Sequence, residues 1–366
     1  MQICLSPGGP SVFNTDEPAS ELLVATMDGL VALRRSDDRG AWDLTGRALE
    51  GRHVDALLHE PASGMLFVGT FGDSLHASED GGATWERRDS GIDSDQIYSL
   101  NAVRVGDSVR VYAGTQPARL YVSEDLGAHW RELSSFPTVA SVHDWDFPSP
   151  PHVAHLKGIA FDPHQPTTIY VGVEVGGLFR SLDSGDTWTE VLGFDEEWNG
   201  DYHRLSIRPN RPDELFLSSG PGMWRSRDGG RSWAHLSDRT ERIGYPDGVI
   251  AHPDRDDLLF VAGAASNPGT WRKLGTADAR VARSHDGGDS WEVLSSGLPD
   301  EIHGNLEAMC MNVYPGGFEL FVGGIDGDVF SSVDEGDTWQ QVATGLPSVS
   351  KGVVGRTRAG VIAGWK

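Results

Sequence analysis

The sequence is poor in cysteine and in long apolar runs, and each shortage argues against a class of protein. Two cysteines, Cys4 and Cys310, cannot build a disulfide framework, and neither lies in a CxxC pair. We therefore expect free thiols, with a single bridge between the two as the alternative. No run of about 18 apolar residues is present, which argues against a transmembrane helix. The first ten residues lack a basic region and a long apolar core, so we expect no secretory signal and a soluble, cytoplasmic protein.

Basic residues are also scarce. The chain carries 30 Lys and Arg against 54 Asp and Glu, which gives a formal net charge of −24 at pH 7. A polyanion of this kind repels phosphate backbones and anionic lipid headgroups, so we expect neither nucleic acid nor a membrane surface as a partner. We expect instead a small-molecule or oligosaccharide ligand, and a chain that works as a monomer or a small homo-oligomer.

Turn-forming residues, by contrast, are abundant. Of the 366 residues, 46 are glycine and 20 are proline, a composition that favours many short strands joined by tight turns. The hydrophobic fraction of 38% and the charged fraction of 23% are typical of a globular chain. No useful length of the sequence shows helical periodicity, so we predict an all-β protein.

One short pattern recurs along the chain. It reads Ser-x-Asp-x-Gly-x-Thr/Ser-Trp and is complete in residues 78–85, 181–188, 226–233, 284–291 and 332–339. A sixth copy, residues 123–130, has His129 in place of the threonine, and a shorter copy occupies residues 36–42. The seven aspartates stand at positions 38, 80, 125, 183, 228, 286 and 334, so successive copies are 42 to 58 residues apart. That interval suits one four-stranded unit per copy.

The residue types of the repeat suit a tight hairpin. An aspartate side chain accepts backbone N–H groups, a glycine adopts positive φ, and the tryptophan buries a large ring as the next strand begins. The pattern resembles the Asp-box, or bacterial neuraminidase repeat, of sialidase-like and YVTN-like propellers. The resemblance implies a seven-bladed β-propeller, one domain over residues 1–366, with each box joining the third and fourth strands of a blade. We predict structural aspartates, because the twelve-residue ligand spacing of a calcium loop is missing.

The two ends of the chain are expected to close the ring. The apolar stretch 21–25 opens the chain, and the stretches 351–355 and 360–364 end it. Because closure removes the open sheet edges of a propeller, we predict that the N- and C-terminal strands share a blade. The tryptophans of the complete boxes are predicted to be buried at equivalent positions: Trp85, Trp188, Trp233, Trp291 and Trp339.

The first strand of each predicted blade lines the central channel, so its polar residues are candidates for function. Aligned on their apolar pattern, the first strands place seven residues at one level of the channel mouth: Asp55, Tyr98, Lys157, His203, Asp247, Glu307 and Lys351. The alignment leaves a one-residue ambiguity at Tyr98, Glu307 and Lys351. Two residues earlier, on the same strand face, lie His53, Gln96, His155, Asp201, Tyr245 and Asn305, with His303 close by. Crowded ionisable groups in a partly desolvated mouth shift one another's pKa values, which separates acids from bases.

These two levels supply the predicted site. The predicted catalytic residues are Asp55, Lys157, His203, Asp247 and Glu307. The predicted ligand-binding residues are His53, Tyr98, His155, Tyr245, His303, Trp145 and Trp271. The two tryptophans belong to long inserts, residues 134–154 and 264–280. Both inserts are expected on the rim of the propeller at the channel mouth, together with an acidic, aromatic loop at 195–198.

Three kinds of chemistry stay open at this site. A carboxylate pair, Asp55 with Asp247 or Glu307, suits glycoside hydrolysis. Lys157 or His203 suits the base of a lyase or an isomerase. The histidines suit a zinc, copper or iron site, although no local ligand spacing supports one: His53, His155, His203 and His303. We therefore predict no cofactor and keep a divalent metal as the alternative.

The family resemblance narrows the choice. Sialidases carry a Phe/Tyr-Arg-Ile-Pro motif and an arginine triad, whereas this sequence lacks the motif and Arg204 is expected on the strand face away from the ring. We therefore predict a sialidase-like fold without sialidase activity. Xyloglucan-cleaving members with this repeat are secreted two-propeller enzymes, and photosystem assembly factors with it are scaffolds. An acid–base enzyme and a non-catalytic interaction scaffold are thus the rival functions.

Overall fold

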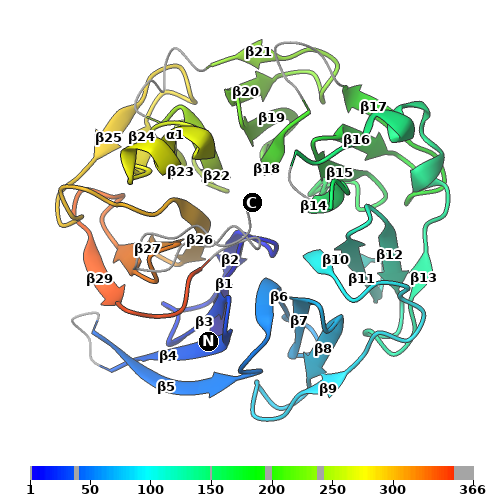
Figure 1. Cartoon of the computed structure of the whole chain (residues 1–366), viewed down its shortest axis with the longest axis horizontal. Helices are drawn as coiled ribbons and strands as arrows, with labels where there is room; N and C mark the ends of the chain where they lie inside the picture. The colour runs from blue at the N-terminus through cyan, green and yellow to red at the C-terminus, as the bar shows by residue number, and fades with distance from the viewer. Residues whose placement is uncertain (1, 37–40, 149–150, 194–199, 237–242, 350–366) are drawn as a thin grey trace.

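Seven small β-sheets arranged in a ring form the structure, which is a computed structural model (Figure 1). It describes residues 2–36, 41–148, 151–193, 200–236 and 243–349. Each sheet is one blade, and the blades follow one another around the ring in chain order. The predicted seven-bladed β-propeller is confirmed.

The first four blades take four strands each. Blade 1 consists of β1 (Gln2–Leu5), β3 (Glu21–Thr26), β4 (Gly29–Arg35) and β5 (Trp42–Ala48). Blade 2 consists of β6 (His53–Glu60), β7 (Met65–Phe71), β8 (Leu75–Ser78) and β9 (Glu86–Arg87). Blade 3 consists of β10 (Ile97–Val105), β11 (Ser108–Thr115), β12 (Leu120–Ser123) and β13 (Arg131–Glu132). Blade 4 consists of β14 (His155–Phe161), β15 (Ile169–Glu174), β16 (Gly177–Ser181) and β17 (Thr189–Leu192).

The last three blades complete the ring. Blade 5 consists of β18 (Tyr202–Arg208), β19 (Arg211–Ser219), β20 (Gly222–Ser226) and β21 (Ala234–His235). Blade 6 consists of β22 (Tyr245–Ala251), β23 (Leu259–Ala264), β24 (Arg280–Ser284) and β25 (Glu292–Leu294). Blade 7 consists of β26 (Leu306–Tyr314), β27 (Gly317–Gly324), β28 (Val329–Ser332) and β29 (Gln340–Ala343), with β2 (Val12–Asn14) added at its inner edge.

The hydrophobic clusters lie between neighbouring blades rather than at one centre. Between blades 2 and 3, for example, Leu58 and Phe67 pack with Val111 and Tyr121. Because both faces of a blade are covered in this way, its inner strands read as nearly continuous apolar runs. Polar side chains on these inner strands therefore depart from the apolar pattern, and the packing of the blades does not explain them.

Ring closure uses the N-terminal segment in two places. Strand β2 pairs in parallel with β26, so an N-terminal strand shares blade 7 with the last strands of the described chain. The stretch expected to join them, β3, instead pairs with β1 and β4 in blade 1. The predicted closing strands at 351–355 and 360–364 lie outside the described residues.

The six full-length repeat turns share one hydrogen-bonding pattern. In the turn that follows β8, Ser78 Oγ donates to Asp80 Oδ1, which also accepts the Thr84 backbone N–H at 2.8 Å, and Thr84 Oγ1 donates to Asp80 Oδ2. These bonds, the one from the Thr84 hydroxyl above all, lower the pKa of Asp80 to about 2. The same contacts recur around Asp125, Asp183, Asp228, Asp286 and Asp334. The shorter copy falls partly on residues 37–40, outside the described residues.

The box tryptophans are less buried than predicted, with one exception among the five. Trp339 is 5% exposed, whereas Trp85, Trp188, Trp233 and Trp291 are half-buried. These rings lie between their own turn and the preceding blade. The Trp233 indole N–H, for instance, lies within hydrogen-bond distance of the Gly230 carbonyl of its turn and of the Val191 carbonyl of blade 4. One edge of such a ring stays open to solvent.

Helix is rare, in agreement with the predicted all-β class. The described residues include the α-helix α1 (Pro268–Leu274) and two 3-10 helices, η1 (Phe136–Thr138) and η2 (Ala140–Asp144). Asn267 caps α1 through its side chain, and Gly275 ends it in the left-handed conformation. Seven residues are too few to show helical periodicity, so the cap residues were the usable signal. No helix in the described part of the chain is long and apolar enough to span a bilayer.

Candidate functional site

The predicted ring residues occupy one equivalent position in six blades. In each of β6, β10, β14, β18, β22 and β26, the pairing with the second strand shifts register by one residue near the start of the strand. The extra residues at these β-bulges are Asp55, Tyr98, Lys157, His203, Asp247 and Glu307. We call this set the bulge ring. Its register settles the ambiguity at Tyr98 and Glu307, whereas Lys351 lies outside the described residues.

A bulge residue is a local exception to strand geometry. It is left out of the pairing ladder, and its side chain is re-aimed relative to the regular alternation. Bulges recur beside functional sites for this reason. Six bulges at the same level bring polar side chains of six blades toward the ring axis, where packing alone would favour apolar residues.

The N-terminal segment between β1 and β2, here called the crossing segment, lies near the centre of the propeller in Figure 1. The Gly8 N–H donates to the Asp55 carbonyl, and the Gly8 carbonyl accepts the Leu100 N–H, both at 3.0 Å. On the other side, the Arg204 guanidinium donates to the carbonyls of Pro7 and Gly9. Blades 2, 3 and 5 are thus tied to one crossing segment.

Gly8 is required at this crossing for steric reasons. A Cβ on Gly8 would lie 2.0 Å from the Tyr98 carbonyl oxygen, which is a backbone atom and cannot move aside as the end of a flexible side chain could. We therefore expect Gly8→Ala to lower the free energy of unfolding by about 1–3 kcal/mol, the usual cost of overpacking. Gly46→Ala is the matched control, because its nearest neighbour would be the Ala32 Cβ at 3.8 Å. Denaturant midpoints of the two variants decide the matter, and equal midpoints would remove the steric requirement.

Glu174 links two residues of blade 4, and the sequence-based prediction missed it. Its Oε1 lies 2.6 Å from Lys157 Nζ, and its Oε2 lies 2.6 Å from His155 Nε2. Both partners are buried, with the Lys157 side chain 6% exposed. Glu174 ends the second strand β15, whereas the search covered only first strands. A carboxylate at the end of the apolar run Ile169–Glu174 was the available signal.

His203 is fully buried in blade 5 and is held by a backbone carbonyl. Its Nδ1 lies 2.7 Å from the Pro246 carbonyl oxygen and 3.8 Å from Asp247 Oδ1. Its Nε2 lies 3.4 Å from Asp201 Oδ1. Since a carbonyl only accepts, the Pro246 contact places a proton on Nδ1.

Asp247 is buried between blades 5 and 7. Its Oδ2 accepts a hydrogen bond from the Asn305 side-chain amide, which comes from the level two residues before Glu307. Its side chain is 3% exposed. Arg204 interacts electrostatically with both Asp247 and Asp55, so the prediction that Arg204 faces away from the ring is wrong. The bulge at His203 shifts the alternation of β18, which is why the period-two rule failed here.

Two tyrosines show that the acidic side chains of several blades share one environment. Burial raises the pKa of Tyr98, and the charges of Asp55 and Glu174 raise it further. Burial also raises the pKa of Tyr245, and four carboxylates add to the effect: Asp201, Asp247, Glu174 and Glu307. Carboxylates of several blades thus act on the same two tyrosines, and we call this group the acidic unit.

Aromatic rings surround this acidic unit. Tyr98 stacks on His155 with ring centroids 3.9 Å apart. Tyr245 packs against His203 at 4.8 Å and edge-on against Trp271 of α1 at 5.6 Å. Trp271, which belongs to the insert 264–280, thus supports the site indirectly by packing against Tyr245.

Three other predicted ligand-binding residues lie less centrally. His53 is half-buried and packs against Phe71. His303 is exposed, with its ring 3.5 Å from Glu301. Trp145 packs against Phe136 and Phe179 in the hydrophobic cluster between blades 3 and 4. The third predicted loop, 195–198, lies outside the described residues.

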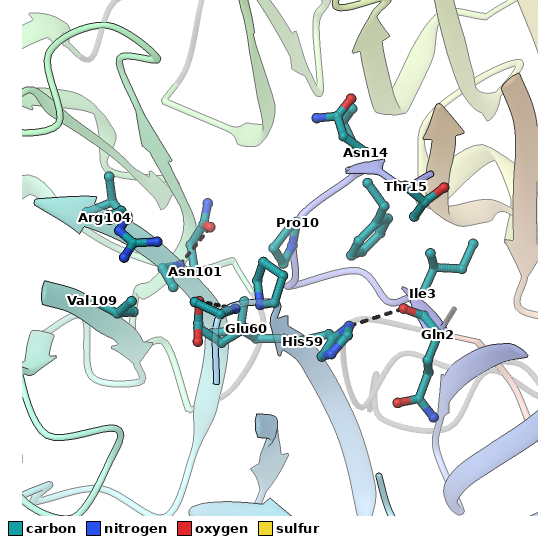
Figure 2. Close-up of a pocket in the computed structure, with 17 residues that line it drawn as sticks. Gln2, Ile3, Pro10, Asn14, Thr15, His59, Glu60, Asn101, Arg104 and Val109 are labelled. Carbon is teal, nitrogen blue, oxygen red and sulfur yellow. Dashed lines mark hydrogen bonds between the residues drawn. The ribbon is translucent and has the colours of Figure 1, made fainter. Parts of the chain in front are cut away.

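A separate pocket lies at the far ends of the first strands (Figure 2). It has a volume of about 390 Å³ and is lined by residues of β1, β2, β6 and β10. Pro10 of the crossing segment contributes to its wall, and His59 Nδ1 lies 3.1 Å from the Gln2 carbonyl oxygen, as the dashed line shows. None of the predicted site residues lines it, so this pocket and the bulge ring are distinct.

The described residues form a seven-bladed β-propeller in which carboxylates of several blades act on the same two tyrosines. No family model matches the sequence. The chain is 28% identical over 275 residues to an oligoxyloglucan-reducing end-specific xyloglucanase of Emericella nidulans. The match covers 63% of this chain but only 32% of that enzyme. It is 23% identical over 285 residues to the photosystem II assembly lipoprotein Ycf48 of Synechococcus sp., covering 69% of this chain and 78% of Ycf48. The chain thus spans about a third of the xyloglucanase and most of the assembly protein.

Solved structures give the same two groups of proteins. An ancestral GH74 enzyme has a TM-score of 0.63 at 14% identity, over 80% of this chain and 38% of that one. YCF48 from Cyanidioschyzon merolae has a TM-score of 0.57 at 16% identity, over 87% of this chain and 96% of that one. YCF48 bound to D1 peptide has a TM-score of 0.50 at 17% identity, over 91% and 88% of the two chains. At these identities the likeness shows the fold alone.

Proposed function

We propose that this protein binds a saccharide-like ligand at the bulge ring and cleaves it by acid–base catalysis, as a glycoside hydrolase-like propeller. The observation that carries the proposal is the placement of Asp55, Asp247 and Glu307 at equivalent bulges of three first strands, with the charges of Asp247 and Glu307 both acting on Tyr245. Glycoside hydrolysis needs two carboxyl groups in different environments, one to donate a proton and one to act as base or nucleophile.

Asp247 and Glu307 are our candidates for the two carboxyl groups. They come from the adjacent blades 6 and 7, at equivalent bulges, and both act on Tyr245. Asp247 is buried and hydrogen-bonded by Asn305, whereas Glu307 is half-buried. Two carboxyl groups in different environments suit the different roles of proton donor and base.

Other residues of the unit suit recognition of a sugar. The rings of Tyr98 and Tyr245 supply apolar faces of the kind on which sugar rings stack. Lys157, held by Glu174, supplies a positive charge that orients a hydroxyl or stabilises a developing anion. The similarity to a xyloglucanase supports this class of ligand, although the shared segment is a third of that enzyme.

A screen of the purified chain tests the proposal. We expect saturable release of reducing ends from xyloglucan oligosaccharides or from a panel of aryl glycosides. Reactions with His164→Ala, which removes an exposed imidazole from the turn between β14 and β15, should match the wild type. Absence of turnover above a buffer control on every substrate would contradict the proposal.

Assembly scaffolding is the second candidate. The match to Ycf48 favours it, because the matched segment covers 78% of Ycf48 but only 32% of the xyloglucanase. In that case the central charges would hold a peptide. Fluorescence anisotropy with a library of labelled peptides distinguishes the two: saturable peptide binding without glycoside turnover would favour the scaffold.

A further inference from the structure

Three potential metal ligands of blades 4 and 5 lie together beside the bulge ring. One ligand atom each of Glu174, Asp201 and His203 lies within 4.8 Å of the other two. Glu174 ends β15, and Asp201 and His203 flank the start of β18, where a backbone bridge joins Glu174 to Asp201. The cluster is thus fixed by strand pairing rather than by a long loop.

His203 is prepared as a ligand. Because Nδ1 donates to the Pro246 carbonyl at 2.7 Å, the neutral ring carries its lone pair on Nε2. The His203 side chain is 0% exposed, and its Nε2 makes no hydrogen bond in the described structure. This lone pair faces Asp201 Oδ1 at 3.4 Å, which is also an acceptor. Two acceptors this close to each other favour a cation between them, either a proton or a metal ion.

The surrounding charges favour a cation with more than one positive charge. Five carboxylates interact in this unit: Asp55, Glu174, Asp201, Asp247 and Glu307. Among the described residues of this network, Lys157 and Arg204 supply the fixed positive charge. Arg204 is also engaged by two backbone carbonyls of the crossing segment. Carboxylates in such excess over positive charge are stabilised by a bound divalent ion.

We propose that Glu174, Asp201 and His203 bind one divalent transition-metal ion of the Zn²⁺ or Mn²⁺ type. One imidazole and two carboxylates are a donor set that these ions accept, and three protein ligands leave a position for water or a ligand oxygen. Ligand atoms about 2.1 Å from a common ion are at most about 4.2 Å apart, so the observed 4.8 Å limit needs only a small side-chain adjustment.

The residues that contact these three ligands also suit a metal site. The Pro246 carbonyl orients His203, as backbone carbonyls commonly orient metal-bound imidazoles. His155 and Lys157 each contact one oxygen of Glu174, so two side chains orient the carboxylate that would bind the ion. The sequence-based metal alternative named four histidines, of which only His203 belongs to this set.

Metal titration tests the inference. Tag-free protein is stripped with EDTA and titrated with Mn²⁺ and Zn²⁺ by calorimetry, and bound metal is counted by elemental analysis. We expect one equivalent per chain in the wild type, and affinity at least about 100-fold weaker in His203→Ala and Asp201→Asn. His164→Ala, which removes an exposed imidazole from the turn between β14 and β15, should bind like the wild type.

Thermal unfolding keeps the test decisive if a variant is less stable. Metal should raise the unfolding temperature of the wild type, as any ligand of the native state does, and should leave that of His203→Ala unchanged. No stoichiometric uptake by the wild type, or equal affinity in all variants, would overturn the inference. Metal binding without glycoside turnover would leave it standing and would count against the proposed hydrolysis alone.

Discussion

Replacing Asp247 by asparagine should lower kcat on the substrate found in the glycoside screen by about 10²–10⁴-fold, the usual contribution of a positioned acid or base. Asparagine keeps the size of the side chain and its acceptor oxygen, so the contact from Asn305 survives. KM should change little, because the sugar still meets Tyr98 and Tyr245. The loss should therefore fall on the chemical step.

Glu301→Gln is the control for this prediction. It makes the same carboxylate-to-amide change on an exposed side chain just before the first strand of blade 7. Its kcat should equal that of the wild type. Equal turnover in the Asp247 and Glu301 variants would remove Asp247 from the catalytic machinery.

Replacing Trp339 by alanine should lower the free energy of unfolding by about 3–5 kcal/mol, the range for a fully buried tryptophan. Trp339 is 5% exposed and packs with Leu294 and its neighbours between blades 6 and 7. Its backbone is also enclosed, since the Trp339 N–H donates to the Ser296 carbonyl at 2.9 Å. Trp85 is half-buried, so Trp85→Ala should cost less.

Val333→Ala is the matched control, because Val333 lies in the same turn and is 59% exposed. Its denaturant midpoint should stay close to that of the wild type, as for most surface substitutions. If Trp339→Ala shifts the midpoint no more than Val333→Ala, the box tryptophan does not hold the blades together.

The blade count and the ring positions were predictable because both depend on short-range periodicity. Seven box copies at blade-sized intervals mark the blades, and one apolar pattern per first strand locates residues such as Lys157 and Asp247. The bulges themselves carry no signature in a single strand. They were found only as polar residues two positions before an apolar run, and Arg204 was misplaced because a bulge reverses the expected face.

The rest of the site depends on contacts between distant segments. Glu174 meets His155 across the blade 4 ladder and Asp201 across a blade boundary, and no spacing in the sequence brings these residues together. Gly8 is a similar case. A Cβ at this position would collide with the carbonyl of Tyr98, which is 90 residues away in the sequence. Such contacts follow from the closed ring rather than from any local pattern.

A crystal structure of the Asp247→Asn variant soaked with a xyloglucan oligosaccharide would test most directly where this protein works. We expect sugar density beside the bulge ring, with a glycosidic oxygen near residue 247 and Glu307 and a sugar face against Tyr98 or Tyr245. Sugar density confined to the pocket around His59 and Arg104, with none at the ring, would contradict the assignment of function to the propeller axis.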